Sequence, residues 1–249
     1  GVAQSVRRAE IQTARARLRD IPGRLNVPSF SIAVARSGKI IWSEAVGYAD
    51  IQTANPATPQ TKYRLGSTSK AVTATGVARL VSQGRLNLDD SIGHRIPNFP
   101  EKRWNFTTRQ LLSHTAGIGN YENFLSAHSI FTTLCNCRQF DSVTEALSVF
   151  NDFELLFQPG TDFKYSSFGT ILASAVIEVA SGQPFLEFME LQVFQAHGMA
   201  STVGDHSKPN IAGLATFYES SEGAFREWRA LGVFPREINL SYKWAGGGL

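Results

Sequence analysis

Residues 62–84 read KYRLGSTSKAVTATGVARLVSQG, and this stretch decides the fold because a strand-like segment passes directly into a helix. From Ser67 onward the apolar side chains recur at helical spacing, and Gly84 is a typical residue just past a helix end. The pattern predicts a helix from Ser67 to Gln83. Lys70 lies three residues after Ser67 on the same helix face, so the two side chains can meet.

Ser67 and Lys70 form a Ser-x-x-Lys pattern that suits nucleophilic catalysis. A lysine that has lost its proton can accept the proton of the serine hydroxyl, and the positive end of the helix favours the negative charge that then develops. The pattern alone is weak evidence, because it also describes a serine that caps a helix beside a lysine in solvent.

Tyr165 is a second candidate for chemistry, at the mouth of an apolar helix predicted from about Ser167 to Ser181 and ended by Gly182. A phenol beside a lysine ammonium can have a lowered pKa, so Tyr165 could serve as a general base. The structural alternative is a tyrosine packed at a helix start, with Ser166 or Ser167 as the cap.

The flanking sequence predicts an N-terminal helix at residues 4–20, ended by Pro22 and Gly23, and then a β-hairpin. The hairpin strands are expected at Ser29–Arg36 and Ile40–Tyr48, around a turn at Ser37-Gly38. Further helices are expected at Thr107–His114, from the capping box Ser142-Val-Thr-Glu145 through Phe150, and at Gln183–Ala196. We expect one domain over 1–249, with a sheet part at 1–65, a helical part at about 66–200 and an irregular segment at about 201–249.

Composition is that of an ordinary soluble globular protein, with 43% hydrophobic and 18% charged residues among 249. The formal charge of +3 is too small to indicate nucleic acid as a partner. Arginines near the start of the chain fit a solvated helix face, with contact to an anionic membrane as the alternative. An apolar run of about 18 residues is absent, so the sequence predicts no membrane span.

Metal-ligand spacing is also absent, so neither a metal nor another cofactor is predicted. Cys135 and Cys137 form a lone Cys-x-Cys, which we expect to be two free thiols because a disulfide that close is strained. The five histidines show no metal-binding pattern: His94, His114, His128, His197 and His206.

Four segments, taken in order, resemble the penicillin-recognising family of class C β-lactamases and D-alanyl-D-alanine carboxypeptidases. They are Gly-Ser-Thr-Ser-Lys at 66–70, Leu-Leu-Ser-His-Thr-Ala-Gly-Ile at 111–118, Pro-Gly-Thr-Asp-Phe-Lys-Tyr-Ser-Ser at 159–167 and Lys-Trp-Ala-Gly-Gly-Gly-Leu at 243–249. The resemblance spans about residues 25–249. It is strongest to the mitochondrial branch of animals and the bacterial relatives of that branch, on residues 142–147 and 241–248.

This resemblance implies an α/β fold, an α+β sandwich of the β-lactamase/transpeptidase type, with an antiparallel sheet flanked by helices and an all-helical region. It implies that Ser67 attacks an acyl carbon, that Lys70 assists deprotonation, and that Tyr165 passes the proton to the leaving group. Ser167 would contact substrate, the backbone N–H of Ser67 would stabilise an oxyanion, and His114 would support the site. No cofactor is implied.

Two departures from the family pattern bear on activity. Ser167 stands where efficient β-lactamases usually have Asn, which implies weak or absent β-lactamase activity. The third family motif, Lys or His followed by Ser or Thr and Gly, is missing, because Lys243-Trp-Ala-Gly lacks the hydroxyl residue and occupies an earlier position. We therefore expect the native protein to continue beyond Leu249 with the C-terminal strands of the sheet.

The sequence thus predicts a serine hydrolase of peptidase or esterase type that acts on a small-molecule or peptide substrate through an acyl-enzyme. The alternative is a catalytically weak scaffold, filament-forming or penicillin-binding protein, and the sequence leaves a homo-oligomer open. The resemblance favours a periplasmic or secreted bacterial location, with a mitochondrial one as the alternative. The chain begins with Gly1 rather than Met, which is compatible with a removed targeting segment.

Overall fold

The computed structural model describes residues 2–97, 99–124, 140–205, 211–221, 224–227 and 240–249, so Cys135 and Cys137 lie outside the described residues. The chain separates into two compact units. One unit holds residues 1–63 and 212–236, and the other holds residues 64–211 and 237–249.

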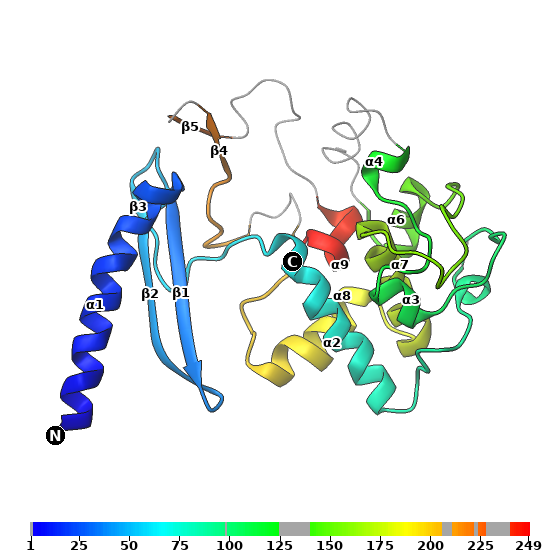
Figure 1. Ribbon diagram of the computed structural model, residues 1–249, viewed down its shortest axis with the longest axis horizontal. Helices are drawn as coiled ribbons and strands as arrows, with labels where there is room; N and C mark the ends of the chain where they lie inside the picture. Colours follow the sequence, from blue (N-terminus) through cyan, green and yellow to red (C-terminus); the bar gives the residue numbers. More distant parts are fainter. Residues whose placement is uncertain (1, 98, 125–139, 206–210, 222–223, 228–239) are drawn as a thin grey trace. The chain divides into compact units, whose positions relative to one another are not determined.

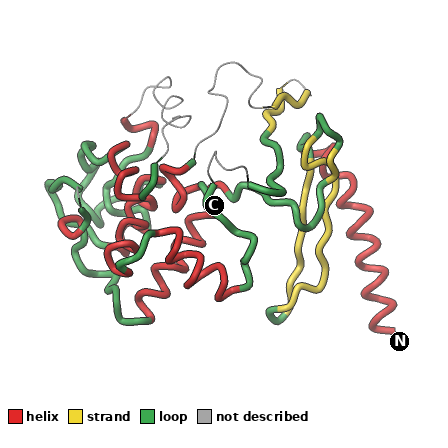
Figure 2. Tube along the Cα trace, turned by 180° about the vertical axis from the view of Figure 1, so that it is seen from behind, coloured by secondary structure: helices red, strands yellow, loops and turns green. Residues whose placement is uncertain are grey.

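The first unit is built on the predicted hairpin, which is confirmed. Strands β1 (Ser29–Arg36) and β2 (Lys39–Asp50) pair antiparallel, with Phe30 opposite Val46 and Val34 opposite Trp42. The short strand β3 (Asn55–Pro56) extends the sheet in the order β1-β2-β3. Helix α1 (Val2–Leu25) lies along the hairpin, and Arg15 Nε donates to Glu44 Oε2 of β2 at 2.6 Å (Figures 1 and 2).

Helix α1 continues through Pro22 to Leu25, so the prediction that Pro22 and Gly23 end it is wrong. Proline removes one helical N–H and crowds the carbonyl four residues earlier, which costs stability but does not by itself stop a helix that packing holds in place. Leu18, one turn before Pro22, is only 2% exposed. Burial of this apolar face offsets the lost hydrogen bond.

A second small ladder belongs to the same unit. Strands β4 (Tyr218–Ser221) and β5 (Ala224–Glu227) pair antiparallel, although the whole segment after residue 200 was expected to be irregular. The Tyr218 hydroxyl donates to Asp50 Oδ1 at 2.8 Å and accepts from the Ile51 N–H at 2.9 Å. This contact joins residues far apart in sequence, so local patterning could not reveal it.

The second unit is helical. Its elements are η1 (Gly66–Thr68), α2 (Ser69–Ser82), η2 (Gly93–Arg95), α3 (Thr108–Leu112), α4 (Tyr121–Phe124), α6 (Val143–Ala146), η3 (Leu147–Val149), α7 (Ser167–Ser181), α8 (Phe185–Met189), η4 (Glu190–Phe194), η5 (Gln195–His197), η7 (Ser241–Lys243) and α9 (Trp244–Gly247). Together the units confirm the predicted combination of a small antiparallel sheet with a helical region.

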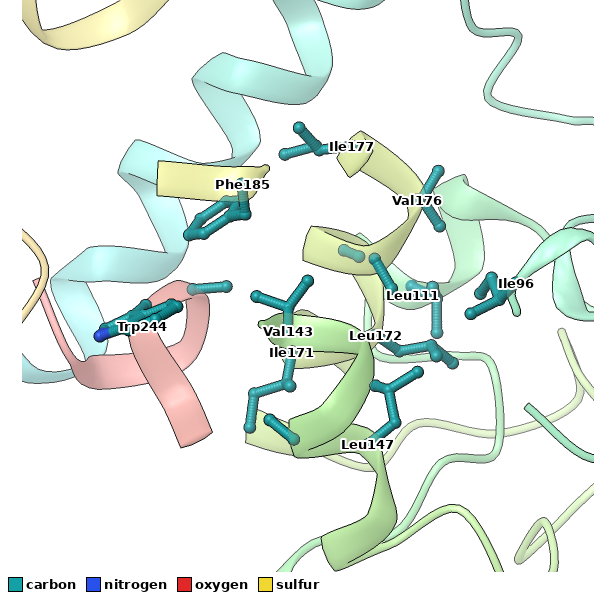
Figure 3. Close-up of a cluster of buried hydrophobic side chains, with 14 of the residues drawn as sticks. Ile96, Leu111, Val143, Leu147, Ile171, Leu172, Val176, Ile177, Phe185 and Trp244 are labelled. Atoms are coloured by element: carbon teal, nitrogen blue, oxygen red, sulfur yellow. The ribbon is translucent and has the colours of Figure 1, made fainter. Parts of the chain in front are cut away.

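Helix α7 is the centre of the helical core, as its almost wholly apolar sequence predicts. Its predicted bounds are confirmed: Ser166 caps the start by accepting from the Gly169 N–H at 2.8 Å, and Gly182 ends it in the left-handed conformation. Figure 3 shows Ile171, Leu172, Val176 and Ile177 of this helix among core side chains contributed by several other elements. Helices α2 and α9 both pack against α7.

The helix predicted at Gln183–Ala196 is broken into α8, a π-helical turn (η4) and a short 3-10 turn (η5). The buried residues explain the break. Phe188 and Val193 are five residues apart, as are Met189 and Phe194, and all four are buried. A π-turn rather than an α-turn brings positions five apart onto one face.

No single helix in the described part of the chain is both long and apolar enough to cross a membrane. Helix α7 and the helical segment Phe185–His197 pass this test only as a pair, bent by 79°.

Candidate active site

The three residues expected to carry chemistry meet in the second unit. Ser67 lies in η1, the first turn of the predicted helix, and its side chain is exposed. Lys70 Nζ donates to Ser67 Oγ at 3.1 Å from the next turn. The Tyr165 hydroxyl donates to the same oxygen at 2.9 Å. One exposed serine oxygen therefore accepts from both groups that could exchange a proton with it.

Lys70 is held from a second side by α9. Its Nζ donates to the carbonyl oxygen of Gly246 at 2.6 Å and lies 5.0 Å from the centre of the Tyr165 ring. A lysine has many rotamers, so two fixed acceptors are needed to keep its nitrogen in one place. The Gly246 carbonyl is the second acceptor, beside Ser67 Oγ, that restricts the position of the Lys70 nitrogen.

The Tyr165 phenol has a lowered pKa. Burial by itself would raise it, but hydrogen bonding with Lys70 and Ser67 and the charge of Lys70 outweigh burial, with a smaller contribution from Ser167. The side chain is 41% exposed, so the phenol is accessible from outside. A lowered pKa makes the phenolate a more accessible state, which is what a base needs.

His114 supports the tyrosine. The rings of His114 and Tyr165 are 4.7 Å apart, and His114 Nδ1 accepts from the Ser166 N–H at 3.3 Å. Burial, followed by the charge of Lys70, lowers the pKa of His114. Its backbone has a φ of 60°, a left-handed value that non-glycine residues adopt only when their surroundings enforce it.

Ser167 lies below this surface rather than on it. It is 8% exposed, and its N–H donates to Asn120 Oδ1 at 3.1 Å. The neighbouring cap, Ser166, donates its hydroxyl to the Gly119 carbonyl at 2.7 Å. Ser167 therefore offers little surface to a substrate, in contrast to the exposed Ser67.

The glycine-rich C-terminal segment closes over the same helices. The Leu249 carbonyl accepts from the Leu65 N–H at 2.9 Å, and the Leu249 N–H donates to Ser69 Oγ at 3.2 Å. The Thr73 hydroxyl donates to the Ala245 carbonyl at 3.0 Å. These contacts fix the backbone of α9 beside Lys70.

Sequence reasoning missed Gly246 and Asn120 as members of the site. A backbone carbonyl leaves no side-chain pattern in the sequence. The glycine run at 246–248 is the available signal, and the structure explains it at Gly246, where a Cβ would stand 3.2 Å from the Ser167 carbonyl oxygen. Asn120 gave no signal of its own, because its role depends on the fold bringing it to the start of α7.

Within the described residues, no group of three or more His, Cys, Asp or Glu side chains could hold a metal ion. The groups gathered at Ser67 are instead hydroxyls, an amine and an imidazole, which suit proton transfer and nucleophilic attack.

Comparison with known proteins gives one family. The profile of the Beta-lactamase family matches residues 14–249. The serine beta-lactamase-like protein LACTB, mitochondrial, of Homo sapiens is 30% identical over 299 residues, which cover 96% of this chain and 53% of that protein. The chain spans about half the length of these curated relatives.

Solved structures share the fold. EstCE1, described as a hydrolase with promiscuous acyltransferase activity, superimposes with a TM-score of 0.77 at 24% identity, covering 95% of this chain and 68% of that one. The octameric penicillin-binding protein homologue from Pyrococcus abyssi gives a TM-score of 0.72 at 23% identity, covering 96% and 52%.

Proposed function

Because this chain belongs to the β-lactamase family, we propose that it is a serine hydrolase in which Ser67 forms a covalent acyl-enzyme with an amide or ester substrate. The observation that carries the proposal is the exposed Ser67 oxygen, which lies 3.1 Å from Lys70 Nζ and 2.9 Å from the Tyr165 hydroxyl. A serine that serves only as a helix cap needs neither contact.

In the proposed reaction Ser67 Oγ attacks the carbonyl carbon while its proton passes to the Tyr165 oxygen, with Lys70 keeping the phenolate form accessible. The proton then goes to the leaving nitrogen or oxygen as the scissile bond breaks. Water releases the acyl group through the same residues in reverse. Ser67 stands in the first turn of its helix, where a backbone N–H has no acceptor one turn earlier, so this N–H can stabilise the oxyanion.

Amide and ester cleavage use the same groups, so the substrate must be found by experiment. The name of EstCE1 describes acyl transfer, which is chemistry of the proposed kind. We rank an ester or peptide amide ahead of a β-lactam because Ser167 replaces the amide side chain that efficient β-lactamases carry. A chromogenic ester, an anilide and a chromogenic cephalosporin distinguish the three classes.

The test is intact-protein mass spectrometry before and after incubation with a fluorophosphonate probe. Wild type should gain one adduct and Ser67→Ala none. Ser82→Ala is the matched control, because this exposed serine ends the same helix and should leave labelling unchanged. An unlabelled wild-type protein would refute the hydrolase.

A second candidate function is a catalytically weak scaffold that assembles into oligomers. The octameric state in the name of the Pyrococcus abyssi homologue favours it. A scaffold should elute as a large assembly and should be unaffected by Ser67→Ala, whereas an enzyme loses turnover.

The mitochondrial location named for the human relative supports the mitochondrial alternative over a periplasmic or secreted one.

A further inference from the structure

Asn120 directly precedes α4, but its side chain contacts a different helix. An asparagine at such a position usually caps its own helix with its side-chain oxygen. Here the turn is closed in another way, because the Asn123 N–H donates to the Asn120 carbonyl at 3.0 Å and the Asn120 N–H donates to Asn123 Oδ1 at 3.0 Å. The Asn120 side chain, which is 9% exposed, is thereby available for contacts outside its own turn.

Both ends of the Asn120 amide form hydrogen bonds. Its Oδ1 accepts from the Ser167 N–H at 3.1 Å. This N–H belongs to the first turn of α7, where the backbone donors have no acceptor within the helix. Its Nδ2 donates to Glu122 Oε2 at 3.0 Å. A planar amide that is bonded at both ends fixes its two partners relative to each other, here the start of α7 and the Glu122 carboxylate.

Glu122 extends the contact to Lys164. Its other oxygen, Oε1, lies 3.1 Å from Lys164 Nζ. Burial acts to raise the pKa of Glu122, but its own backbone N–H, Lys164 and Asn120 together lower it, so the carboxylate is charged at neutral pH. Both side chains of the ion pair are partly solvated, and such a pair stabilises little by itself. Its position therefore depends on the more buried amide of Asn120.

Lys164 and Ser167 lie on either side of Tyr165 in the sequence, so these contacts form a closed circuit around it, the Asn120 circuit. The circuit runs from the Asn120 amide through Glu122 to Lys164 and returns from Ser167 to the same amide. The segment 164–167 is thus held from both sides of Tyr165 by one buried side chain.

We propose that Asn120 is a positioning residue for the proposed base, Tyr165, and that its amide keeps the Tyr165 hydroxyl at Ser67 by holding both sides of the segment 164–167. Acid–base catalysis depends on such placement, because a small displacement of a reacting group lowers the rate strongly. This inference rests on the proposed function for its catalytic meaning. The Asn120 circuit itself is a property of the folded protein and can be measured without a substrate.

Asn120→Asp opens the circuit at one point. The substitution keeps an oxygen for the Ser167 N–H, but it places a carboxylate oxygen opposite Glu122, where the amide donor stood. Adding Glu122→Gln exchanges the two groups, so that an amide again donates to a carboxylate and the total charge returns to that of the wild type. The double variant should therefore recover what Asn120→Asp loses, which independent effects of the two changes would not produce.

Hydrolysis of two acetate esters is the functional readout. Phenyl acetate has the poorer leaving group, so it depends more than p-nitrophenyl acetate on a proton from Tyr165. In Asn120→Asp we expect kcat/KM to fall about tenfold for phenyl acetate, the effect of one lost hydrogen bond, and clearly less for p-nitrophenyl acetate. The double variant should return both values to within about twofold of wild type. A purely structural role would lower both values equally.

Amide hydrogen exchange, followed by NMR, tests the circuit without a substrate. The Lys164 N–H donates to the His114 carbonyl at 2.9 Å. In Asn120→Asp this N–H should exchange about tenfold faster than in wild type, because the segment that bears it opens more often. The Ser167 N–H keeps its acceptor in this variant and should retain its protection. In the double variant the exchange of Lys164 should return to the wild-type rate.

Asn87→Asp is the matched control. Asn87 Oδ1 accepts from the Asp89 N–H at 3.1 Å and its Nδ2 donates to Asp90 Oδ1 at 3.0 Å, so the substitution alters the same two kinds of contact in another loop. It should leave the Lys164 exchange and both ester rates unchanged.

An unchanged Lys164 exchange in Asn120→Asp would overturn the proposal, as would an equal loss for both esters or a double variant that recovers nothing. If Asn120→Asp does not fold, Lys164→Met opens the circuit at its exposed end, and an unchanged ratio of the two ester rates in that variant would overturn the proposal. Loss and recovery of Lys164 exchange in a protein whose wild type hydrolyses neither ester and takes no fluorophosphonate would uphold the circuit and refute the hydrolase instead.

Discussion

Lys70 Nζ donates to the Gly246 carbonyl oxygen at 2.6 Å, across 176 positions of sequence. The contact joins the helix of the proposed nucleophile to the glycine-rich segment of α9. A lysine anchored in this way reaches Ser67 from a fixed direction, and it holds its charge beside the Tyr165 ring. A side chain at 246 would be tightly packed, because α9 lies close to the start of α7 and a Cβ there would stand 3.2 Å from the Ser167 carbonyl oxygen.

Gly246→Ala should therefore impair both the fold and the reaction. The new Cβ would lie 3.2 Å from the Ser167 carbonyl oxygen and 3.5 Å from Ile171 Cγ1, so the backbone that bears the carbonyl must move. Overpacking of this kind costs about 1–3 kcal/mol. We expect a lower melting temperature and an acylation rate reduced by about tenfold, the effect of one lost charge-assisted hydrogen bond.

Gly169→Ala is the control for that substitution. A Cβ on Gly169 would meet Ser166 atoms at 3.6 Å, which is ordinary contact, and alanine favours the helix. It should keep the wild-type labelling rate. Equal rates in the two variants would show that the Gly246 carbonyl does not position Lys70.

Tyr165→Phe should abolish most activity while preserving stability. The change removes the hydroxyl that contacts Ser67 and keeps the ring that packs on His114. Loss of a general base lowers kcat/KM by about 10²- to 10⁴-fold. Hydrolysis of a chromogenic ester measures the effect, with Tyr48→Phe, an exposed tyrosine of β2, as the control. Activity within about twofold of wild type would remove Tyr165 from the mechanism.

The local parts of this arrangement are legible in the sequence. Ser67 and Lys70 meet because three-residue spacing puts them on one helix face, and the bounds of α7 follow from its cap and its terminal glycine. The hairpin follows from alternation around one turn. Only the family resemblance predicts that Tyr165 lies beside Ser67, because no local rule brings together two residues 98 positions apart.

The remainder depends on packing between distant segments. The Gly246 carbonyl, the burial of Ser167 and the β4–β5 ladder each rest on contacts across the chain. Local breaker rules also failed at Pro22, where α1 continues because its face is buried. The sequence gives the residue type at each of these positions, but the distant residue that it contacts, and hence its role, follows only from the fold.

His114 should make the protein less stable in mild acid. Burial and then the Lys70 charge lower its pKa in the folded state from the ordinary 6.5. Above pH 6.5 His114 is neutral in both the folded and the unfolded state, so it does not lower the stability there. As the pH falls from 6.5 to the lowered value, the unfolded state binds a proton that the folded state refuses, so stability declines.

His114→Asn should flatten this decline. Asparagine tolerates the left-handed backbone at this position and can still accept from the Ser166 N–H, but it does not titrate. Thermal melts of both proteins from pH 8 to pH 5 measure the difference. His94→Asn, at an exposed histidine, should follow wild type. Parallel curves for wild type and His114→Asn would show that His114 does not determine how stability changes between pH 8 and pH 5.

Asp205→Ala should destabilise the unit that holds the site. Asp205 is 3% exposed and pairs through Oδ2 with Arg64 Nε, while its backbone N–H donates to the Gly248 carbonyl at 2.7 Å. Its own carbonyl accepts from Trp244 Nε1 at 2.9 Å. Removing the carboxylate takes the Asp205 ion pair from a largely buried guanidinium, a change that costs about 3 kcal/mol.

The exposed pair of Asp89 and Arg109 provides the comparison. Its two hydrogen bonds, at 2.7 and 2.9 Å, are as short as those of a buried pair, but both side chains are solvated, so Asp89→Ala should barely change the melting temperature. Chemical denaturation should give a clearly lower free energy of unfolding for Asp205→Ala than for Asp89→Ala. The backbone N–H of residue 205 that donates to the Gly248 carbonyl is kept in Asp205→Ala, so the stability of the unit should fall more than the acylation rate of Ser67. Equal stability of Asp205→Ala and Asp89→Ala would show that the Asp205–Arg64 pair does not stabilise the unit.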